Sequence, residues 1–244
     1  MLRRSVLPVS DHGAAILAML GCLCFLIPTL AAAVADALVP ARGALWQVTG
    51  LLAQQVLMGG LVAWHLFFNL GVSRLDLSWP LWPSRDEIKR GLLAGFGLLV
   101  CNGVGLWLGR RIAVLIMGPG RALAMYHKEQ SVLMGLLRYE QSGMLITLLL
   151  FTVVLVVPIC EELFFRGYLY ATLKAKWGKH AVWMSSLIFT VLHFYVVHGP
   201  AVFLMALGLT FLYEERASLW SNMLAHATLN ALVAGFLLAQ RVIY

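Results

Sequence analysis

Residues 143–173 read GMLITLLLFTVVLVVPICEELFFRGYLYATL, an apolar run that contains only three charged side chains. These are Glu161, Glu162 and Arg166. The run ends at a basic cluster, Lys174, Lys176 and Lys179. Such a cluster is typical of the interface between membrane and water. Counting back about 20 residues, the length that crosses a hydrocarbon core, predicts a transmembrane helix over residues 151–173 with both glutamates near its middle.

The whole chain has the composition of an integral membrane protein. Of its 244 residues, 61% are hydrophobic and only 12% are charged, whereas a soluble domain carries about 25% charged residues. A soluble surface with half that charge would expose apolar patches that aggregate. Soluble enzymes, DNA-binding domains and disordered linkers are therefore excluded. The net charge of +7 indicates membrane topology and contact with anionic lipid headgroups, and it implies no nucleic acid.

Further apolar segments predict an all-α fold, a polytopic membrane bundle of about seven transmembrane helices with room for an eighth. The predicted spans are residues 13–39, 44–72, 91–109, 151–173, 181–197, 200–213 and 219–239. We expect one integral membrane domain over residues 1–244. The basic residues of the connecting segments favour an N-terminus on the inner side of the membrane. We expect this to be a bacterial or archaeal cytoplasmic membrane.

The third span has recognisable start and packing signals. Ser84 and Glu87 form a capping box, which predicts that a helix begins at about Arg85. Within that helix, pairs of glycines stand four residues apart, the spacing that lets two membrane helices approach closely. These pairs are Gly91 with Gly95 and Gly105 with Gly109.

Two segments stay open. Ala33-Val34-Ala35 resembles a signal-peptide cleavage site, but the apolar run around it is longer than the roughly 7 to 15 residues of a signal peptide core. We therefore expect a retained transmembrane helix and leave cleavage after Ala35 open. Residues 110–142 have mixed polarity, and Gly118-Pro119-Gly120 should break any helix there. Their five basic residues would lie outside, against the topology that the other loops favour.

Polar side chains recur at helical spacing in three of the apolar segments. Glu162 and Arg166 are one turn apart and can pair along a helix flank, whereas Glu161 points about 100° away. His226 and Asn230 are likewise one turn apart. Glu161 and His193 each lie 12 residues from the same lysine-marked face, at a depth of about 18 Å. The candidate residues can therefore meet at one depth.

This set of side chains favours amide hydrolysis. A carboxylate beside a neutral imidazole can hold a water molecule and remove its proton as the water attacks a carbonyl. His226 and Asn230 can donate hydrogen bonds to the oxyanion that develops. The chain lacks a GxSxG motif and an HExxH helix, so the signatures of serine hydrolases and of zincins are absent.

The ordered motifs EExxxR, FxxxH and HxxxN resemble the CAAX prenyl protease and bacteriocin-processing family (CPBP, Abi) of intramembrane glutamic endopeptidases. The resemblance covers about residues 156–232 and places a catalytic core in residues 151–239. It implies that Glu161 is the general base together with His193. It further implies three groups with roles: an oxyanion site of His226 and Asn230, a supporting pair of Glu162 and Arg166, and a pocket lined by Phe189.

The same resemblance implies that the partners are membrane lipid and a peptide or protein substrate. The family's substrates are prenylated at a C-terminal CAAX cysteine, and bacterial relatives often act on unprenylated peptides. The expected substrate is therefore a membrane-associated peptide or protein, with or without a prenyl group.

Metal dependence is open at the level of sequence. Glu161, His193 and His226 could supply three ligands to zinc, with a water in the fourth position. We favour a mechanism without a cofactor, because the family is glutamic and because Asn230 suits an oxyanion better than zinc.

Two other classes of function are alternatives. One is a membrane protein of the same fold that binds a peptide, or confers immunity, without cutting. The other is a proton-coupled transporter in which Glu161 and His193 form a relay. Such transporters usually have inverted repeats and broken helices in matching halves, and neither is evident in the sequence.

Overall fold

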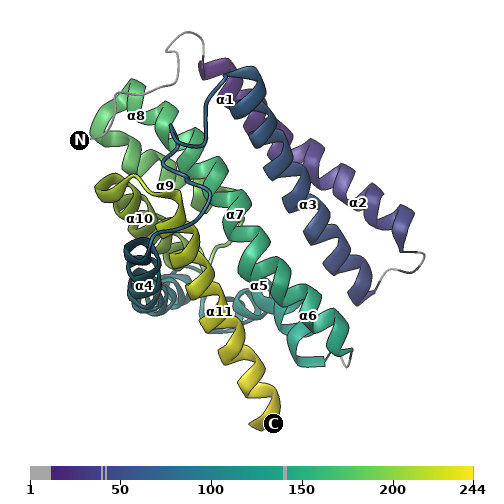
Figure 1. The fold of residues 1–244 in the computed structure, drawn as a ribbon. Coiled ribbons are helices and arrows are strands. Elements are labelled where there is room, and N and C mark those ends of the chain that lie inside the picture. Colours follow the sequence, from purple (N-terminus) through teal and green to yellow (C-terminus); the bar gives the residue numbers. More distant parts are fainter. Residues whose placement is uncertain (1–11, 40, 42, 140–141, 244) are drawn as a thin grey trace.

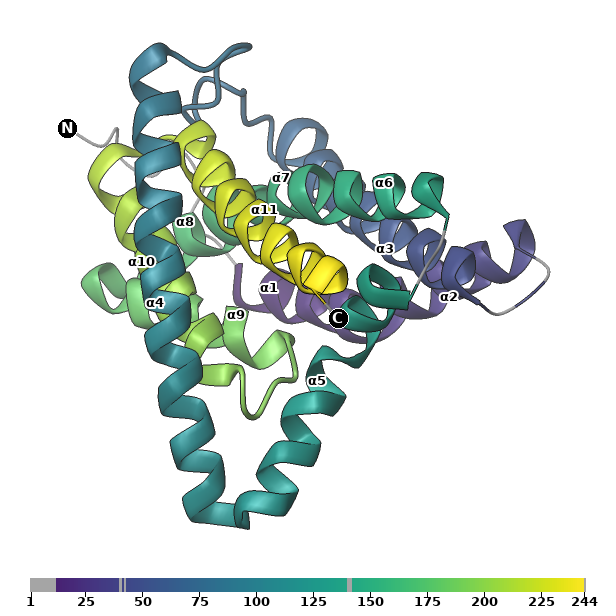
Figure 2. The same ribbon diagram turned by 90° about the horizontal axis from the view of Figure 1, so that it is seen from below.

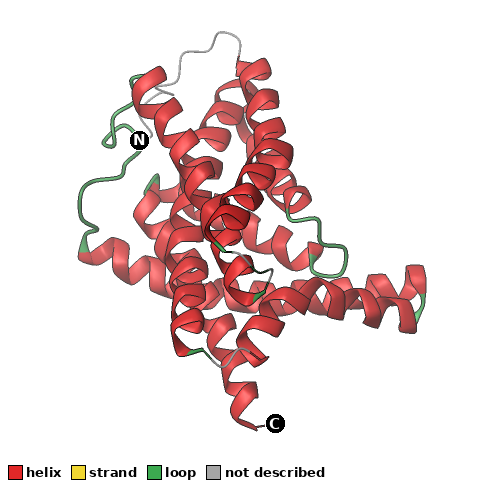
Figure 3. Ribbon diagram, turned by 90° about the vertical axis from the view of Figure 1, so that its right-hand side faces the viewer, coloured by secondary structure: helices red, strands yellow, loops and turns green. Residues whose placement is uncertain are grey.

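A computed structural model describes residues 12–39, 41, 43–139 and 142–243. The described residues form helices and connecting loops, without a strand (Figure 3). The α-helices are α1 His12–Gly21, α2 Ile27–Leu38, α3 Ala44–Trp64, α4 Arg85–Met117, α5 Pro119–Tyr139, α6 Gly143–Phe151, α7 Val157–Glu162, α8 Ala171–Trp177, α9 Ala181–Leu192, α10 Gly199–Arg216 and α11 Leu219–Ile243. The shorter connecting turns are π-helical at Cys22–Leu26, His65–Asn69, Thr152–Val156 and Leu163–Tyr170, and 3-10 at Gly178–His180. The predicted all-α class is confirmed.

Five helical stretches among the described residues are long and apolar enough to cross a membrane. They are Ile16–Leu38, Ala44–Asn69, Arg85–Met117, Gly143–Leu192 and Leu219–Gln240. Many of their large apolar side chains are exposed, as in Phe68 at 82% and Leu115 at 85%, which suits contact with lipid. The chain is an integral membrane protein.

The expected count of about seven spans is not confirmed. Residues 151–173 and 181–197, expected as two spans, fall largely in the 50-residue stretch Gly143–Leu192. α10, expected as a short span, carries Glu214, Glu215 and Arg216 in its last turn, and these charges lower its hydropathy.

The segment that the sequence left unplaced, residues 110–142, continues α4 and then turns back. α4 runs through Arg110 to Met117, well beyond the expected end at Gly109. Gly118 ends it with φ +81°, a left-handed conformation that glycine adopts without strain. From there α5 leads away, and the two helices meet at one tip (Figure 2). The predicted helix break is confirmed.

The predicted start of α4 and its glycine contacts are also confirmed. Ser84 and Glu87 exchange both hydrogen bonds of a capping box. Gly91 and Gly95 pack against α11, where an added Cβ would lie 2.5 Å from Leu224 Cβ and 2.4 Å from Thr228 Cβ, respectively. The later glycines pack against the start of α10: a Cβ at Gly105 would lie 2.4 Å from Ala201 Cα, and one at Gly109 would lie 2.0 Å from Val197 O. α10 and α11 therefore both pack closely against α4.

α6, α7 and α8 form one long rod, and α3, α9, α10 and α11 pack against it. α3 packs along one flank of this rod with α2 on its outer side, and α11 lies on another flank (Figure 1). The main core is built where the rod meets α9 and α10, and it is rich in aromatic side chains. Its fully buried members include Phe164, Tyr168 and Phe189.

α9 ends at Leu192, five residues before the expected end at Val197. Its last turn tightens, since the N–H of His193 bonds to the carbonyl of Thr190 and the N–H of Phe194 to that of Val191. Phe194 then adopts φ +55°, which no regular right-handed helix allows. His193 consequently lies at a helix end, beside a loop, instead of inside a span.

Candidate functional site

The two adjacent glutamates lie on α7, a short α-helical segment between two π-helical turns, Thr152–Val156 and Leu163–Tyr170. Such turns occur frequently at functional sites, because they change the direction of the side chains that follow. α7 lies close to α3, since a Cβ added at Gly59 would come within 2.6 Å of Cys160 Sγ. The glycine therefore permits the close approach that places the glutamates inside the protein.

Glu162 is fully buried and paired on both carboxylate oxygens. Its Oε1 accepts hydrogen bonds from Arg166 Nη1 at 3.1 Å and His226 Nδ1 at 3.0 Å, and its Oε2 accepts one from Asn222 Nδ2 at 3.2 Å. The Glu162–Arg166 pair expected from the i, i+4 spacing is present. The charges of Glu162 and Arg166 thus compensate each other within the protein, as buried ions require.

Arg166 extends this network to two further elements. Its Nη2 donates to the carbonyl of Ala206 on α10 at 3.1 Å, and its Cζ lies 5.3 Å from the centre of the Phe189 ring on α9. The guanidinium is 1% exposed. Glu162 and Arg166 together therefore connect the rod to α9, α10 and α11.

Glu161 has a different environment although it is the neighbouring residue. Its Oε2 is buried and accepts no hydrogen bond. The nearest basic atom that faces it is His226 Nε2, 3.9 Å away, which is too far for a direct hydrogen bond. A water oxygen about 2.8 Å from each of the two atoms would bridge this distance with ordinary hydrogen bonds.

His226 therefore connects the two glutamates. Because an ionised carboxylate only accepts hydrogen bonds, the imidazole donates from Nδ1 to Glu162 and turns Nε2 toward Glu161. The ring is 3% exposed. Glu162 thus fixes the orientation of a histidine whose other nitrogen faces the unpartnered carboxylate.

His193 is joined to this group by the Phe189 ring. The two rings stack with their centres 4.5 Å apart, and the His226 ring centre is 6.4 Å from the same phenyl group. His193 Nδ1 is 2.7 Å from the carbonyl oxygen of Phe189. A carbonyl only accepts, so Nδ1 carries a proton, and the remaining nitrogen, Nε2, is the position at which this ring could accept one.

Asn230 donates from Nδ2 to the carbonyl of Val153 at 2.8 Å. The preceding π-helical bond, from the N–H of Val157 to the carbonyl of Thr152, is present. The next bond in that series would join the N–H of residue 158 to Val153, but proline has no N–H. Asn230 supplies the donor that Pro158 lacks, and its second amide N–H remains for another acceptor.

The structure thus brings Glu161, Glu162, Arg166 and His226 together through contacts, and Phe189 joins His193 to this group. No hydrogen bond between Glu161 and His193 is present. Asn222, which the sequence analysis did not single out, belongs to the site: it is fully buried and bonds to Glu162 and to the carbonyl of Leu209. Its position one turn before His226 was a usable signal, because residues 222, 226 and 230 share one face of α11.

The described residues contain no group of three His, Cys, Asp or Glu side chains arranged to hold a metal ion. Glu161, His193 and His226, named as a possible zinc set, are therefore not assembled as ligands in this conformation.

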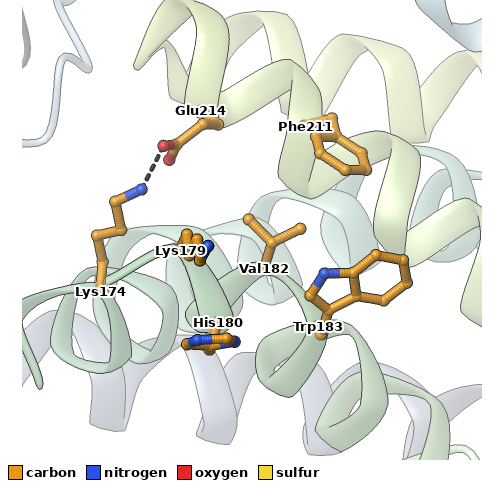
Figure 4. A pocket seen from close by; sticks show the side chains of 7 residues that line it. All are labelled: Lys174, Lys179, His180, Val182, Trp183, Phe211 and Glu214. Atoms are coloured by element: carbon orange, nitrogen blue, oxygen red, sulfur yellow. Dashed lines mark hydrogen bonds and ion pairs between the residues drawn. The ribbon is translucent and has the colours of Figure 1, made fainter. Parts of the chain in front are cut away.

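A pocket of about 420 Å³ lies at a separate place, where α8, α9 and α10 meet (Figure 4). It is bordered by the ion pair of Lys174 and Glu214 and by the exposed rings of Trp183 and Phe211. None of its lining residues is a candidate site residue.

Residues 143–232 match the family model described as type II CAAX prenyl endopeptidase Rce1-like. Every residue predicted for the site lies inside this range, and the resemblance drawn from the three motifs is confirmed over it. Neither the curated proteins nor the solved structures gave a match to the chain.

Proposed function

We propose, from the similarity of residues 143–232 to type II CAAX prenyl endopeptidases, that this protein is an intramembrane endopeptidase of glutamic type. It would hydrolyse a peptide bond of a membrane-associated peptide or protein, with a water molecule as nucleophile. The observation that carries the proposal is the pair of neighbouring glutamates with opposite environments. Glu162 is fully paired, whereas Glu161 has a buried oxygen without a hydrogen bond.

The chemistry follows from that difference. A carboxylate whose hydrogen bonds are already satisfied is a poor base, so Glu162 serves to hold Arg166 and His226. Glu161 is the group free to take a proton from water as the water oxygen bonds to the substrate's carbonyl carbon. The proton then passes to the leaving amide nitrogen as the carbon–nitrogen bond breaks. His193 supports the base through its available Nε2.

The oxyanion that forms during attack needs hydrogen-bond donors. Asn230 has one N–H left after its bond to Val153. His226 can donate through Nε2 only when both ring nitrogens carry protons, since Nδ1 is bound to Glu162. Both side chains come from α11, so one helix would hold the oxyanion while the rod supplies the base.

We further propose that the reaction needs no metal, because a carboxylate base can by itself take the proton from the attacking water. Cleavage should then continue in the presence of a chelator. Loss of cleavage on chelation, with recovery on addition of zinc, would contradict this part.

The test compares purified wild type with Glu161→Gln and His193→Ala in detergent. Each protein is incubated with quenched peptides, prenylated and plain, and the products are weighed by mass spectrometry. The expected result is cleavage by wild type and no cleavage by either variant. The product masses identify the bond and show whether a lipid is needed.

A matched control makes the comparison specific. Glu215→Gln removes the same charge from an exposed position on α10 and should cut as wild type does, and all variants should elute alike in gel filtration. If Glu161→Gln still cleaves peptides, a mechanism with Glu161 as the base is ruled out. Failure of wild type to cut any peptide would favour the binding or immunity protein.

A further inference from the structure

Glu129 on α5 binds the loop between α9 and α10. Its Oε1 accepts hydrogen bonds from the backbone N–H groups of Val196 at 2.6 Å and Val197 at 2.9 Å. Its Oε2 accepts from the backbone N–H of His198 at 2.9 Å and from His198 Nδ1 at 2.6 Å. One carboxylate thus holds four donors that lie 67 to 69 residues away in the sequence. Its side chain is 6% exposed.

The place of this contact favours a negative charge. His198 is the N-cap residue of α10, so the carboxylate lies at the positive end of a helix dipole, where three successive N–H groups converge on it. Because these N–H groups precede the first intrahelical bonds of α10, they have no helical partner of their own. Glu129 satisfies them.

Two neighbours on α5 hold the same histidine. The Tyr126 ring stacks on the His198 ring, with centres 5.1 Å apart and planes 10° apart. Gln130 Nε2 lies 3.1 Å from His198 Nε2. An imidazole that donates to Glu129 from Nδ1 and accepts from Gln130 at Nε2 satisfies all three residues. The three α5 side chains, Tyr126, Glu129 and Gln130, are called the α5 clamp below.

The loop that the α5 clamp holds begins at His193. α9 ends there in a tightened turn, and Phe194 has φ +55°, which is unfavourable for a bulky side chain. Such a conformation persists only where the surroundings enforce it. The Phe194 side chain is 76% exposed and contributes little packing, so the enforcement comes from the bound backbone two to four residues later.

We propose that Glu129 is a positioning residue of the candidate site: by binding the backbone of residues 196–198 it fixes the strained turn at Phe194 and so the place of His193. That Glu129 fixes the loop does not depend on the proposed function. The effect on catalysis does, because it requires the proposed role of His193. Tyr195, whose ring lies 6.0 Å from the His193 ring and 5.6 Å from the His198 ring, joins the two ends of this arrangement.

The test uses the full chain with Glu129→Gln, Glu129→Asp and the control Glu215→Gln. Hydrogen–deuterium exchange of the peptide spanning residues 193–199 is measured together with cleavage kinetics. In Glu129→Gln we expect faster exchange in this peptide and unchanged exchange in peptides from α7 and α11. We expect kcat to fall by about 10²-fold, the effect of a misplacement of about 1 Å, while KM stays unchanged.

The conservative variant distinguishes positioning from general stabilisation. Glu129→Asp keeps the charge on a shorter side chain and should recover part of both the exchange protection and kcat. Unchanged exchange at residues 193–199 in Glu129→Gln would show that Glu129 does not hold this loop and would overturn the proposal. Faster exchange there with an unchanged kcat would overturn the positioning role.

The two proposals can fail separately. If wild type cuts no peptide, the exchange measurement still decides whether Glu129 holds the loop. If Glu129→Gln is not recovered folded, Glu129→Asp takes its place, because its shorter side chain keeps the charge but cannot keep all four hydrogen bonds to residues 196–198. Its exchange at residues 193–199 should rise relative to Glu215→Gln, and an unchanged rate would overturn the proposal.

Discussion

Glu161 and Glu162 show how strongly a local environment separates two identical side chains. They are adjacent, yet the first has a buried oxygen without a hydrogen bond and the second has a partner on both oxygens. The sequence predicted the pairing of Glu162 with Arg166 from spacing alone. It could not show that His226 and Asn222 also bond to Glu162, because those contacts cross from α11 to the rod.

The two glutamates should also differ in their contribution to stability. Substitution of Glu162 should destabilise the protein more than substitution of Glu161, although Glu161 is the proposed base. Glu162→Gln leaves the Arg166 guanidinium buried without its countercharge and should lower the free energy of unfolding by about 3 to 5 kcal/mol. Glu161→Gln removes no hydrogen bond and should cost much less. Thermal unfolding in detergent measures both, and an equal loss in the two variants would contradict the assigned roles.

Asn230 has two expected roles that a double variant can separate. Asn230→Ala removes an oxyanion donor and should slow cleavage by about 10²-fold or more. It also leaves the Val153 carbonyl unpaired, at a cost of about 1 to 3 kcal/mol. Adding Pro158→Ala returns a backbone N–H to that carbonyl, so the double variant should regain stability without regaining cleavage. Recovery of both properties would mean that Asn230 acts only through Val153.

At the scale of elements, α4 illustrates what a sequence pattern can predict. The glycine spacing correctly indicated close helix contact, and Ser84 with Glu87 correctly indicated where the helix begins. Its end was expected too early, because the polarity of residues 110–142 is mixed, whereas α4 continues and Arg110 packs over the Tyr126 ring at 4.7 Å. The tightened end of α9 had no signal in hydropathy, since residues 194–197 are as apolar as the helix before them.

Glycines on α4 should respond to substitution according to what they face. Gly109→Ala would place a Cβ 2.0 Å from the backbone oxygen of Val197, so we expect a loss of about 1 to 3 kcal/mol from overpacking. Gly103→Ala on the same helix meets nothing within 4 Å and should gain up to about 1 kcal/mol from helix propensity. Thermal unfolding of the two variants in the same detergent tests the difference. A loss in both would point to a requirement for glycine unrelated to packing.

At the scale of the whole molecule, the contacts that assemble the site are those the sequence could not supply. Residues 143–232 carry every predicted site residue, and the family match covers the same range. Yet α4 and α5, which precede it, pack against α10 and α11 and bind the loop after His193. Contacts between residues 67 to 69 positions apart have no signature in a single sequence, so Glu129 went unnoticed.

The attachment of α5 should weaken in acid. Burial opposes ionisation of Glu129, but the hydrogen bonds from His198 and the backbone of residues 196–198 outweigh it and hold the pKa below the ordinary value of 4.5. A lowered folded-state pKa stabilises the contact above pH 4.5, and this contribution is lost as the pH falls through the lowered value. The titratable groups near it are His198, which bonds to it, Tyr195 and Tyr126, whose rings contact the His198 ring, and Arg110 and His127, which contact the Tyr126 ring.

Exchange protection of residues 193–199 should therefore be constant from neutral pH down to about 4.5 and fall below it. Protection factors, which correct for the intrinsic pH dependence of exchange, are the measurement. Glu129→Gln should lack this acid transition. A transition of the same size in that variant would assign it to another group.

The two faces of α11 have a consequence for how such a protein changes over generations. One face carries Asn222, His226 and Asn230, and the other presses Leu224 and Thr228 against the glycines of α4. A larger residue at position 91 or 95 would push the helix that bears the site, unless its opposite neighbour had already become smaller. In related proteins, a larger residue at position 91 should therefore occur with a smaller one at 224, and a larger residue at 95 with a smaller one at 228. The substitution on α11 should arise first. Compensating substitutions would then accumulate where α11 packs against α4, on the face of α11 opposite the candidate site.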